Sequence, residues 1–149
     1  MTYDARQIAN WFIKRAQQDD RVLSIMLILK LTYIAHGKHL EKMNTPLFSN
    51  EIQAWRFGPI IVDIYQAFRR QGMKVSVPLP NMLDVENPLD IELLEEVWNE
   101  YSELSTSQLS KFTHISGGPW HLAVKIGGWY APIPSELILQ YYRAKAAVA

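Results

Sequence analysis

The four histidines are the side chains best suited to chemistry at neutral pH, because imidazole changes its charge near a pH of about 6.5. His36 and His39 have a spacing that places both on one face of a helix, whereas His114 and His121 lie far along the chain. Two imidazoles form an incomplete metal site, since a structural zinc ion takes about four ligands. We therefore predict no metal site, with His36 partly buried beside a hydrogen-bond partner and His39 in solvent. A hydrolase or metal-dependent enzyme would need at least three of the four around one pocket.

Carboxylates and hydroxyls do not form a catalytic pattern either. General acid–base chemistry needs two carboxylates in different environments that face one cleft. Glu95 and Glu96 are adjacent on a predicted helix, so they point apart and are typical of a solvated face. Pairing Asp63 with Asp84 has no motif to support it. The hydroxyl-rich segment that begins at Ser105 matches a helix-capping box.

The known cofactor signatures are absent from the chain. It has no cysteine, which excludes disulfides, a cysteine nucleophile and thiolate metal sites. There is no phosphate-binding glycine loop, no dinucleotide fingerprint and no His-Glu-x-x-His zinc motif. We therefore predict a protein that is not an enzyme and that uses no cofactor.

Composition and charge narrow the class of partner. The chain has 149 residues, a length typical of one domain, with 15 basic and 15 acidic residues. Nucleic-acid binding and attachment to anionic membranes both favour a basic excess, so this balance argues against either. The N-terminus lacks a signal-peptide pattern, and the longest apolar stretch, 22–35, is broken by polar residues. We expect a cytoplasmic protein that does not enter a membrane.

Hydrophobic periodicity predicts a mainly α fold. Residues 4–18 have the apolar stripe of an amphipathic helix, and residues 22–40 are apolar on nearly all sides, which is typical of a buried helix. Further helices are predicted at 60–71, with Pro59 in the first turn, and along the second half of the chain. Residues 75–77 favour a short strand. We expect one domain over residues 1–149, with six or seven helices around the helix at about 22–40 and little or no strand.

The tryptophans differ in their local sequence. Trp98 lies on the apolar stripe of a predicted helix and is expected in the core. Trp55 and Trp120 each stand near glycine and proline in turn-like segments. Either these two anchor their turns into the core, or they contribute to a partner surface, where tryptophan is a frequent anchor.

Three ordered stretches of the sequence carry a family resemblance. The first is Lys-Leu-Thr-Tyr-Ile-Ala-His-Gly from Lys30, the second runs from Glu51 through Ala-Trp-Arg-Phe-Gly-Pro-Ile, and the third combines Val-Trp, Leu-x-x-x-Thr-His and Pro-Trp. Together they resemble the Panacea domain family of bacterial and phage antitoxins, which includes SocA-like antitoxins and phage-associated GepA-like proteins. The matching motif residues are Lys30, Leu31, Tyr33, Gly37, Trp55, Gly58, Pro59, Tyr65, Trp98, Thr113, His114, Pro119 and Trp120. The chain departs from the family in a shortened lysine–leucine pattern and in the double glycine before Pro119.

The resemblance implies an antitoxin, encoded beside a toxin gene, that binds a cognate toxin protein and has no enzymatic activity. It also leaves open a proteolytic adaptor, which would deliver the toxin to an ATP-dependent protease. Because members with different toxins share the motif residues, these residues should mainly build the fold. Trp55 and Pro59 would then set a turn, and Thr113 and His114 would hydrogen-bond a helix end. Toxin choice would lie in exposed charged residues, for which the candidates are Lys38, Glu41, Lys42, Arg56, Arg69 and Arg70.

Overall fold

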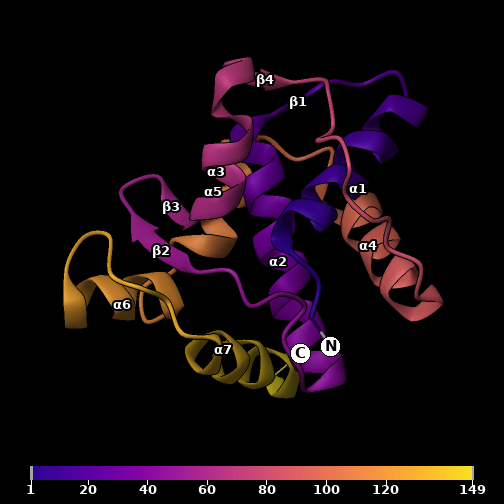
Figure 1. The fold of residues 1–149 in the computed structure, drawn as a ribbon. Coiled ribbons are helices and arrows are strands. Elements are labelled where there is room, and N and C mark those ends of the chain that lie inside the picture. The colour runs from indigo at the N-terminus through magenta and orange to yellow at the C-terminus, as the bar shows by residue number, and fades with distance from the viewer. Residues whose placement is uncertain (1, 149) are drawn as a thin grey trace.

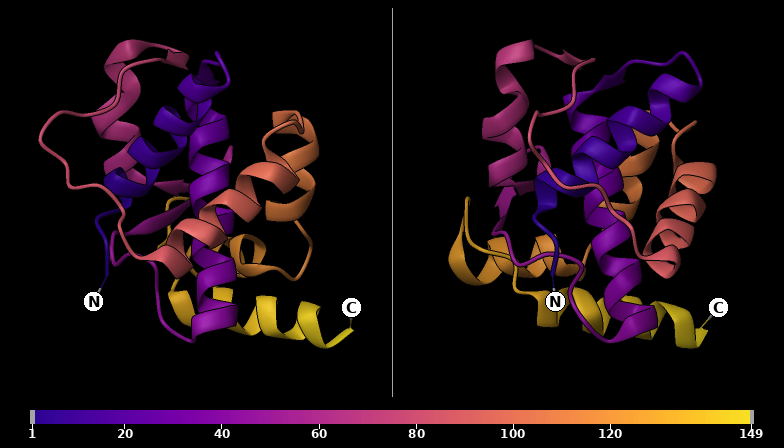
Figure 2. Two further views of the ribbon diagram at one scale, coloured as in Figure 1. Left: turned by 90° about the vertical axis from the view of Figure 1, so that its right-hand side faces the viewer. Right: turned by 45° about the vertical axis from the view of Figure 1, so that its right-hand side comes forward.

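The computed structural model describes residues 2–148, apart from the side chain of residue 148, and is arranged around helix α2 (Ile25–Met43). This helix crosses the middle of the molecule and contacts α1, α3, α4, α5 and α7 (Figures 1 and 2). It confirms the predicted buried central helix, with both ends three residues later than the expected 22–40. The later start has a local cause, because the Ser24 hydroxyl accepts a hydrogen bond from the Leu27 amide and so caps the helix. Asn44, in a left-handed conformation, ends it.

The remaining helices surround α2 and confirm the mainly α prediction. They are α1 (Ala5–Gln18), α3 (Val62–Phe68), the 3₁₀ helix η1 (Arg69–Gln71), α4 (Pro88–Tyr101), α5 (Thr106–Thr113), α6 (Pro119–Gly127) and α7 (Ser135–Val148). Capping boxes start α1 at Asp4 and α5 at Ser105, and Asn87 caps α4 ahead of its first-turn proline. Within residues 2–148, no helix combines the length and the apolar character needed to cross a bilayer.

Two small antiparallel sheets join these helices. Strand β1 (Leu23–Ser24) pairs with β4 (Lys74–Val75), and β2 (Ile52–Trp55) pairs with β3 (Gly58–Ile61). The predicted place of Pro59 in a helical turn is wrong, because Pro59 lies in β3 opposite Ala54 and the helix begins only at Val62. Proline is tolerated there because β3 is an edge strand. All four residues of β3, 58–61, are buried.

Helix α7 packs closely against the lower end of α2 (Figure 2). Gly37 makes this approach feasible, since a Cβ atom at this position would overlap the ring of Tyr142 in α7. The glycine therefore serves close helix packing and does not end the helix.

Candidate functional site

The β2–β3 hairpin ends in a tight turn with Arg56 and Phe57 at its tip. Trp55 pairs with Gly58 to close the turn. Gly58 has a φ angle of 109°, a backbone conformation that glycine adopts without strain. A side chain at Gly58 would also overlap the imidazole of His114. The turn therefore depends on glycine for two separate reasons.

Lys30 lies behind this turn, on the face of α2 that contacts β3. Its side chain is only 2% exposed, and its Nζ donates a long hydrogen bond of 3.4 Å to the carbonyl oxygen of Phe57. No ion pair forms on Lys30 within residues 2–148. Burial without a carboxylate lowers the pKa of Lys30 to about 8. The hairpin tip is thus tied to the central helix by a buried cation.

His114 and Trp120 hold the other side of the turn. Their rings stack with centroids 4.5 Å apart, and the Trp120 indole nitrogen donates a 2.7 Å hydrogen bond to the carbonyl oxygen of Trp55. Burial and then the positive charge of Lys30 lower the pKa of His114, which favours the neutral imidazole. Its Nε2 is buried and has no hydrogen-bond partner in the described part of the chain.

The segment after α6 runs along the free edge of β2. The Tyr130 amide donates to the Ala54 carbonyl, and the Ala54 amide donates in turn to the carbonyl of Ala131, each at 2.8 Å. The Ile133 amide continues the pattern with a 2.7 Å bond to the carbonyl of Ile52. These bonds fix the chain at Trp129 and Tyr130 beside the hairpin, and Figure 1 shows α6 next to β2 and β3.

An exposed aromatic surface results, which we call the hairpin face and define as Arg56, Phe57, Trp129 and Tyr130. Phe57 is 67% exposed, Tyr130 58% and Trp129 41%. The Arg56 guanidinium lies over the Trp129 ring, 5.0 Å from its centroid, and the Tyr130 ring contacts the Trp55 ring edge-on. Arginine and large aromatic side chains are the residues that most often dominate binding energy at protein interfaces.

Seven motif residues support the hairpin face: Lys30, Trp55, Gly58, Pro59, Tyr65, His114 and Trp120. The structure thus brings together side chains from α2, β2, β3, α3 and α6, and from the end of α5. The other motif residues lie elsewhere, since Leu31 and Tyr33 are buried in α2 and Trp98 faces α1. Thr113 donates its hydroxyl to the carbonyl of Ser110 within α5.

The six charged candidates do not form one surface. Lys38 pairs with Glu100 and Lys42 with Glu96, so both lysines are bound to α4, and Glu41 stands beside Lys42 on α2. Arg69 and Arg70 are exposed on η1, at the far end of α3 from the hairpin (Figure 1). Of the six, only Arg56 lies in the hairpin face. Phe57, Trp129 and Tyr130 were not predicted from the sequence. The available signal was the position of Trp129 and Tyr130 directly after Gly127-Gly128, which indicates a loop.

The histidines of α2 have separate partners. His36 is buried, bonds to the Ser135 hydroxyl at 3.2 Å, and has a pKa lowered to about 4 by burial and then by the nearby His39. The prediction that His39 is solvated is wrong, because it is buried between the Thr45 carbonyl, 2.6 Å away, and the Asp90 carboxylate, 3.2 Å away. Both ring nitrogens of His39 are therefore engaged within the chain. No cluster of potential metal ligands occurs among the described residues.

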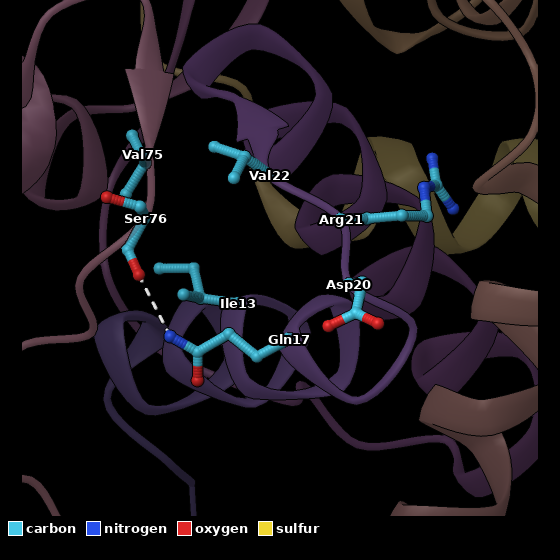
Figure 3. Close-up of a pocket in the computed structure, with 7 residues that line it drawn as sticks. All are labelled: Ile13, Gln17, Asp20, Arg21, Val22, Val75 and Ser76. Atoms are coloured by element: carbon cyan, nitrogen blue, oxygen red, sulfur yellow. Dashed lines mark hydrogen bonds between the residues drawn. The ribbon is translucent and has the colours of Figure 1, made fainter.

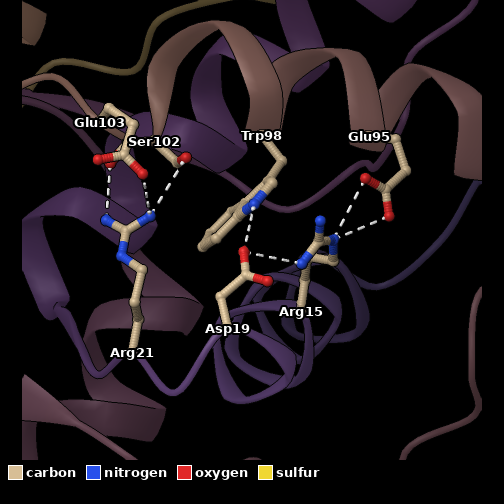
Figure 4. Close-up of polar contacts among 7 residues, drawn as sticks. All are labelled: Arg15, Asp19, Arg21, Glu95, Trp98, Ser102 and Glu103. Carbon is tan, nitrogen blue, oxygen red and sulfur yellow. Dashed lines mark hydrogen bonds and ion pairs between the residues drawn. The ribbon is translucent and has the colours of Figure 1, made fainter.

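A second arginine–tryptophan contact lies between α1 and α4 (Figure 4). The guanidinium groups of Arg15 and Arg21 lie 5.4 and 5.0 Å from the centroid of the Trp98 ring, and Asp19 accepts a 3.3 Å hydrogen bond from its indole nitrogen. Here each arginine also meets carboxylates. Arg15 pairs with Asp19 and Glu95, each at 3.0 Å, and Arg21 pairs with Glu103 at 3.3 Å. The carboxylates of this network compensate both arginine charges within the chain.

A shallow pocket at the end of α1 offers little chemistry (Figure 3). It lies between α1 and the β1–β4 pair and is lined by Ile13, Gln17, Asp20, Arg21, Val22, Val75 and Ser76. Gln17 closes one side with a 2.9 Å hydrogen bond to the carbonyl of Ser76, and the Arg21 side chain points away toward α4. None of the motif residues lines it.

Comparison with known proteins agrees with the arrangement of the motifs. Residues 28–121, more than half of the chain, match the family model for "Antitoxin SocA-like, Panacea domain". The chain is also 33% identical over 128 residues to Antitoxin SocA of Caulobacter vibrioides (strain NA1000 / CB15N), which covers 78% of this chain and 68% of that protein. No solved structure matches the chain significantly. The matched segment contains Lys30, Gly58, His114 and Trp120, which together hold the hairpin turn. The chain therefore belongs to the SocA-like, Panacea-domain family of antitoxins.

Proposed function

We propose that this protein is the antitoxin of a toxin–antitoxin pair and neutralises a co-encoded toxin protein by binding it directly. Family membership supports the antitoxin role. The observation that supports direct binding is the hairpin face, where exposed aromatic residues and an arginine lie on the turn and on the adjoining segment after α6, and the buried Lys30 and the half-buried Trp120 hold the turn. Such a preformed surface loses little conformational entropy on binding, which favours affinity.

The polar side chains elsewhere favour binding over catalysis. Tyr3 donates a 2.6 Å hydrogen bond to Asp90, whose other oxygen faces His39. The second nitrogen of His39 is bound to the carbonyl of Thr45. A general base needs an accessible nitrogen within reach of a substrate proton. The network joins α4 to α2 and is consistent with a structural role for His39.

We further propose that residues 1–149 act as one Panacea-like domain. Helices α1 and α7 lie outside the matched segment 28–121, yet both pack on α2. His36 of α2 bonds to Ser135 at the start of α7, and Tyr142 of α7 lies against Gly37. These contacts favour a single cooperative unit, for which a single unfolding transition is the expected behaviour.

Growth rescue combined with copurification tests the proposal. The gene adjacent to the one for this protein would be induced alone, and then together with this chain. We expect growth arrest in the first case, recovery in the second, and a stable complex on size-exclusion chromatography. An unrelated toxin serves as the specificity control and should not be neutralised.

Two other outcomes would contradict direct neutralisation. Recovery without a stable complex, together with a toxin half-life that lengthens in protease-deficient cells, would identify a proteolytic adaptor instead. An adjacent gene product that is harmless alone and does not bind this chain would contradict the antitoxin function itself.

A further inference from the structure

We propose that the hairpin face is the surface that contacts the toxin, and that it binds a segment in which an acidic side chain is flanked by apolar residues. The inference rests on the proposed function and specifies where the partner binds and by what chemistry. The hairpin face is defined above as Arg56, Phe57, Trp129 and Tyr130.

The two sequence segments that build the hairpin face carry positive side chains and no carboxylate. The chain as a whole is balanced, with 15 basic and 15 acidic residues, but no aspartate or glutamate occurs in residues 53–62 or 104–135. The two segments that build the hairpin face fall within these ranges, which contain Arg56, Lys111 and Lys125 as cations. The carboxylate nearest to them along the hairpin, Glu51, accepts a hydrogen bond from the Gln53 side chain. An acidic group on the partner is the complement that such a surface lacks.

The surroundings of Arg56 differ from those of the other arginines stacked on tryptophan. At Trp98, Arg15 and Arg21 are both paired with carboxylates of the same chain (Figure 4). Arg56 has the same stacking on Trp129 but forms no ion pair within residues 2–148. An arginine that lies over an aromatic ring keeps N–H groups that can bind a carboxylate in a bidentate manner.

The aromatic side chains supply the apolar part of the contact. Phe57, Trp129 and Tyr130 are large, and each retains more than a third of its surface in solvent. Their burial by a partner would release that surface from water, and aromatic anchors typically form the centre of an interface of about 1,200–2,000 Å² in total. The hydrogen bonds of residues 130–133 to β2 and of Trp120 to Trp55 hold this centre in place before binding.

A second exposed apolar region, beside β4, is the main competitor. Met73 and Val77 are exposed there, and Arg69 and Arg70 lie close by in the sequence. This region has no exposed aromatic residue, and no aromatic ring stacks with its arginines in the described chain. It therefore serves as the control surface.

Charge reversal of single arginines tests the surface. The dissociation constant for the purified product of the adjacent gene would be measured for the wild type, Arg56→Glu and Arg70→Glu. We expect Arg56→Glu to weaken binding about a hundredfold and to abolish growth rescue. Arg70→Glu makes the same charge change on an exposed arginine of η1 and should stay within about twofold of the wild type. Thermal unfolding of both variants verifies that each is folded.

Truncation and salt test the two parts of the chemistry separately. Phe57→Ala and Trp129→Ala should each weaken binding about tenfold or more, whereas Leu83→Ala, at an exposed position on another loop, should leave it unchanged. Raising the salt concentration should weaken wild-type binding more steeply than that of Arg56→Gln, because the carboxylate contact is screened.

The outcomes distinguish this inference from the proposed function. If the wild type neutralises the toxin but Arg56→Glu, Phe57→Ala and Trp129→Ala all bind normally, the hairpin face is not the interface. If only Arg70→Glu loses binding, the region beside β4 is the interface instead. If the wild type itself neither binds nor rescues, the proposed function fails.

Discussion

The two arginine–tryptophan contacts, on opposite sides of α2, combine the same residue types but have different surroundings. Between α1 and α4, two arginines flank Trp98 and their charges meet Asp19, Glu95 and Glu103. At the hairpin, Arg56 lies on Trp129 and no carboxylate of the described chain compensates it. A stacked arginine whose carboxylates belong to its own chain joins helices, whereas one without them is available to a partner. The difference lies in the surrounding charges and not in the stacked pair.

The largest expected effect on stability comes from the support of the hairpin. Gly58→Ala should lower the free energy of unfolding by about 2–4 kcal/mol, because a φ of 109° strains any L-residue and the new Cβ overlaps His114. Urea denaturation measures the loss.

Gly72→Ala is the control for that substitution. Gly72 also has a positive φ, of 88°, but a Cβ there meets no atom within 4 Å. It should lose only the strain component, about 1–2 kcal/mol. Equal losses in the two variants would show that the overlap with His114 is unimportant.

Replacement of the buried cation should increase stability. Lys30→Met removes a buried ammonium that has no carboxylate partner, and we expect a gain of about 1–3 kcal/mol at pH 7. The pKa of Lys30 is about 8 in the folded state, against an ordinary value of 10.5. As the pH rises, Lys30 therefore loses its proton at a lower pH in the folded protein than in the unfolded chain. Wild-type stability therefore rises between these pH values, and the advantage of the variant shrinks.

Unfolding at several pH values below about 10 measures this difference, before tyrosines titrate. Lys111→Met, at an exposed lysine of α5, should show neither the gain nor its pH dependence. A constant difference between wild type and Lys30→Met across the range would contradict a buried charged lysine.

The indole hydrogen bond should contribute less. Trp120→Phe keeps an aromatic ring against His114 but removes the donor to the Trp55 carbonyl, at an expected cost of about 1–2 kcal/mol. Trp55→Phe is the comparison, because its indole nitrogen bonds only to the half-buried Gln53 side chain. If Trp120→Phe costs no more stability than Trp55→Phe, the hydrogen bond from Trp120 to the Trp55 carbonyl does not stabilise the hairpin.

The smallest effect on the free energy of unfolding is expected at the ion pairs between α1 and α4. Arg15→Gln breaks the pairs with Asp19 and Glu95, whose side chains are partly exposed, and should cost less than about 1 kcal/mol. It should also leave toxin binding unchanged. A loss of affinity comparable to that of Arg56→Glu would break the distinction between the two regions.

Much of the fold was predictable because helix signals are local. The capping boxes at Asp4 and Ser105 and the Asn87-Pro88 start fix helix beginnings within a few residues of sequence. The hairpin was not predicted, because β2 pairs with β3 and with residues 130–133, and the second pairing is distant in sequence. Propensity cannot report such a contact, and Pro59 misled because proline suits both a first helical turn and an edge strand.

The candidate site divides in the same way. Seven of the motif residues support the hairpin, but the motif does not include Phe57, Trp129 and Tyr130, the exposed aromatic residues that they position. Lys38 and Lys42 were predicted to be exposed charged residues that bind the toxin, yet each forms an ion pair with a glutamate of α4. Whether a charge is compensated depends on a neighbouring helix, which only the tertiary structure reveals.

The anchors of the hairpin have one further consequence. Lys30 binds the carbonyl oxygen of Phe57, and Trp120 binds that of Trp55. Both acceptors belong to the main chain, which every amino acid carries. Point mutations at residues 56 and 57 can therefore accumulate over generations while the turn keeps its shape. On the proposed interface, substitutions at the tip would change the choice of partner while the fold is retained.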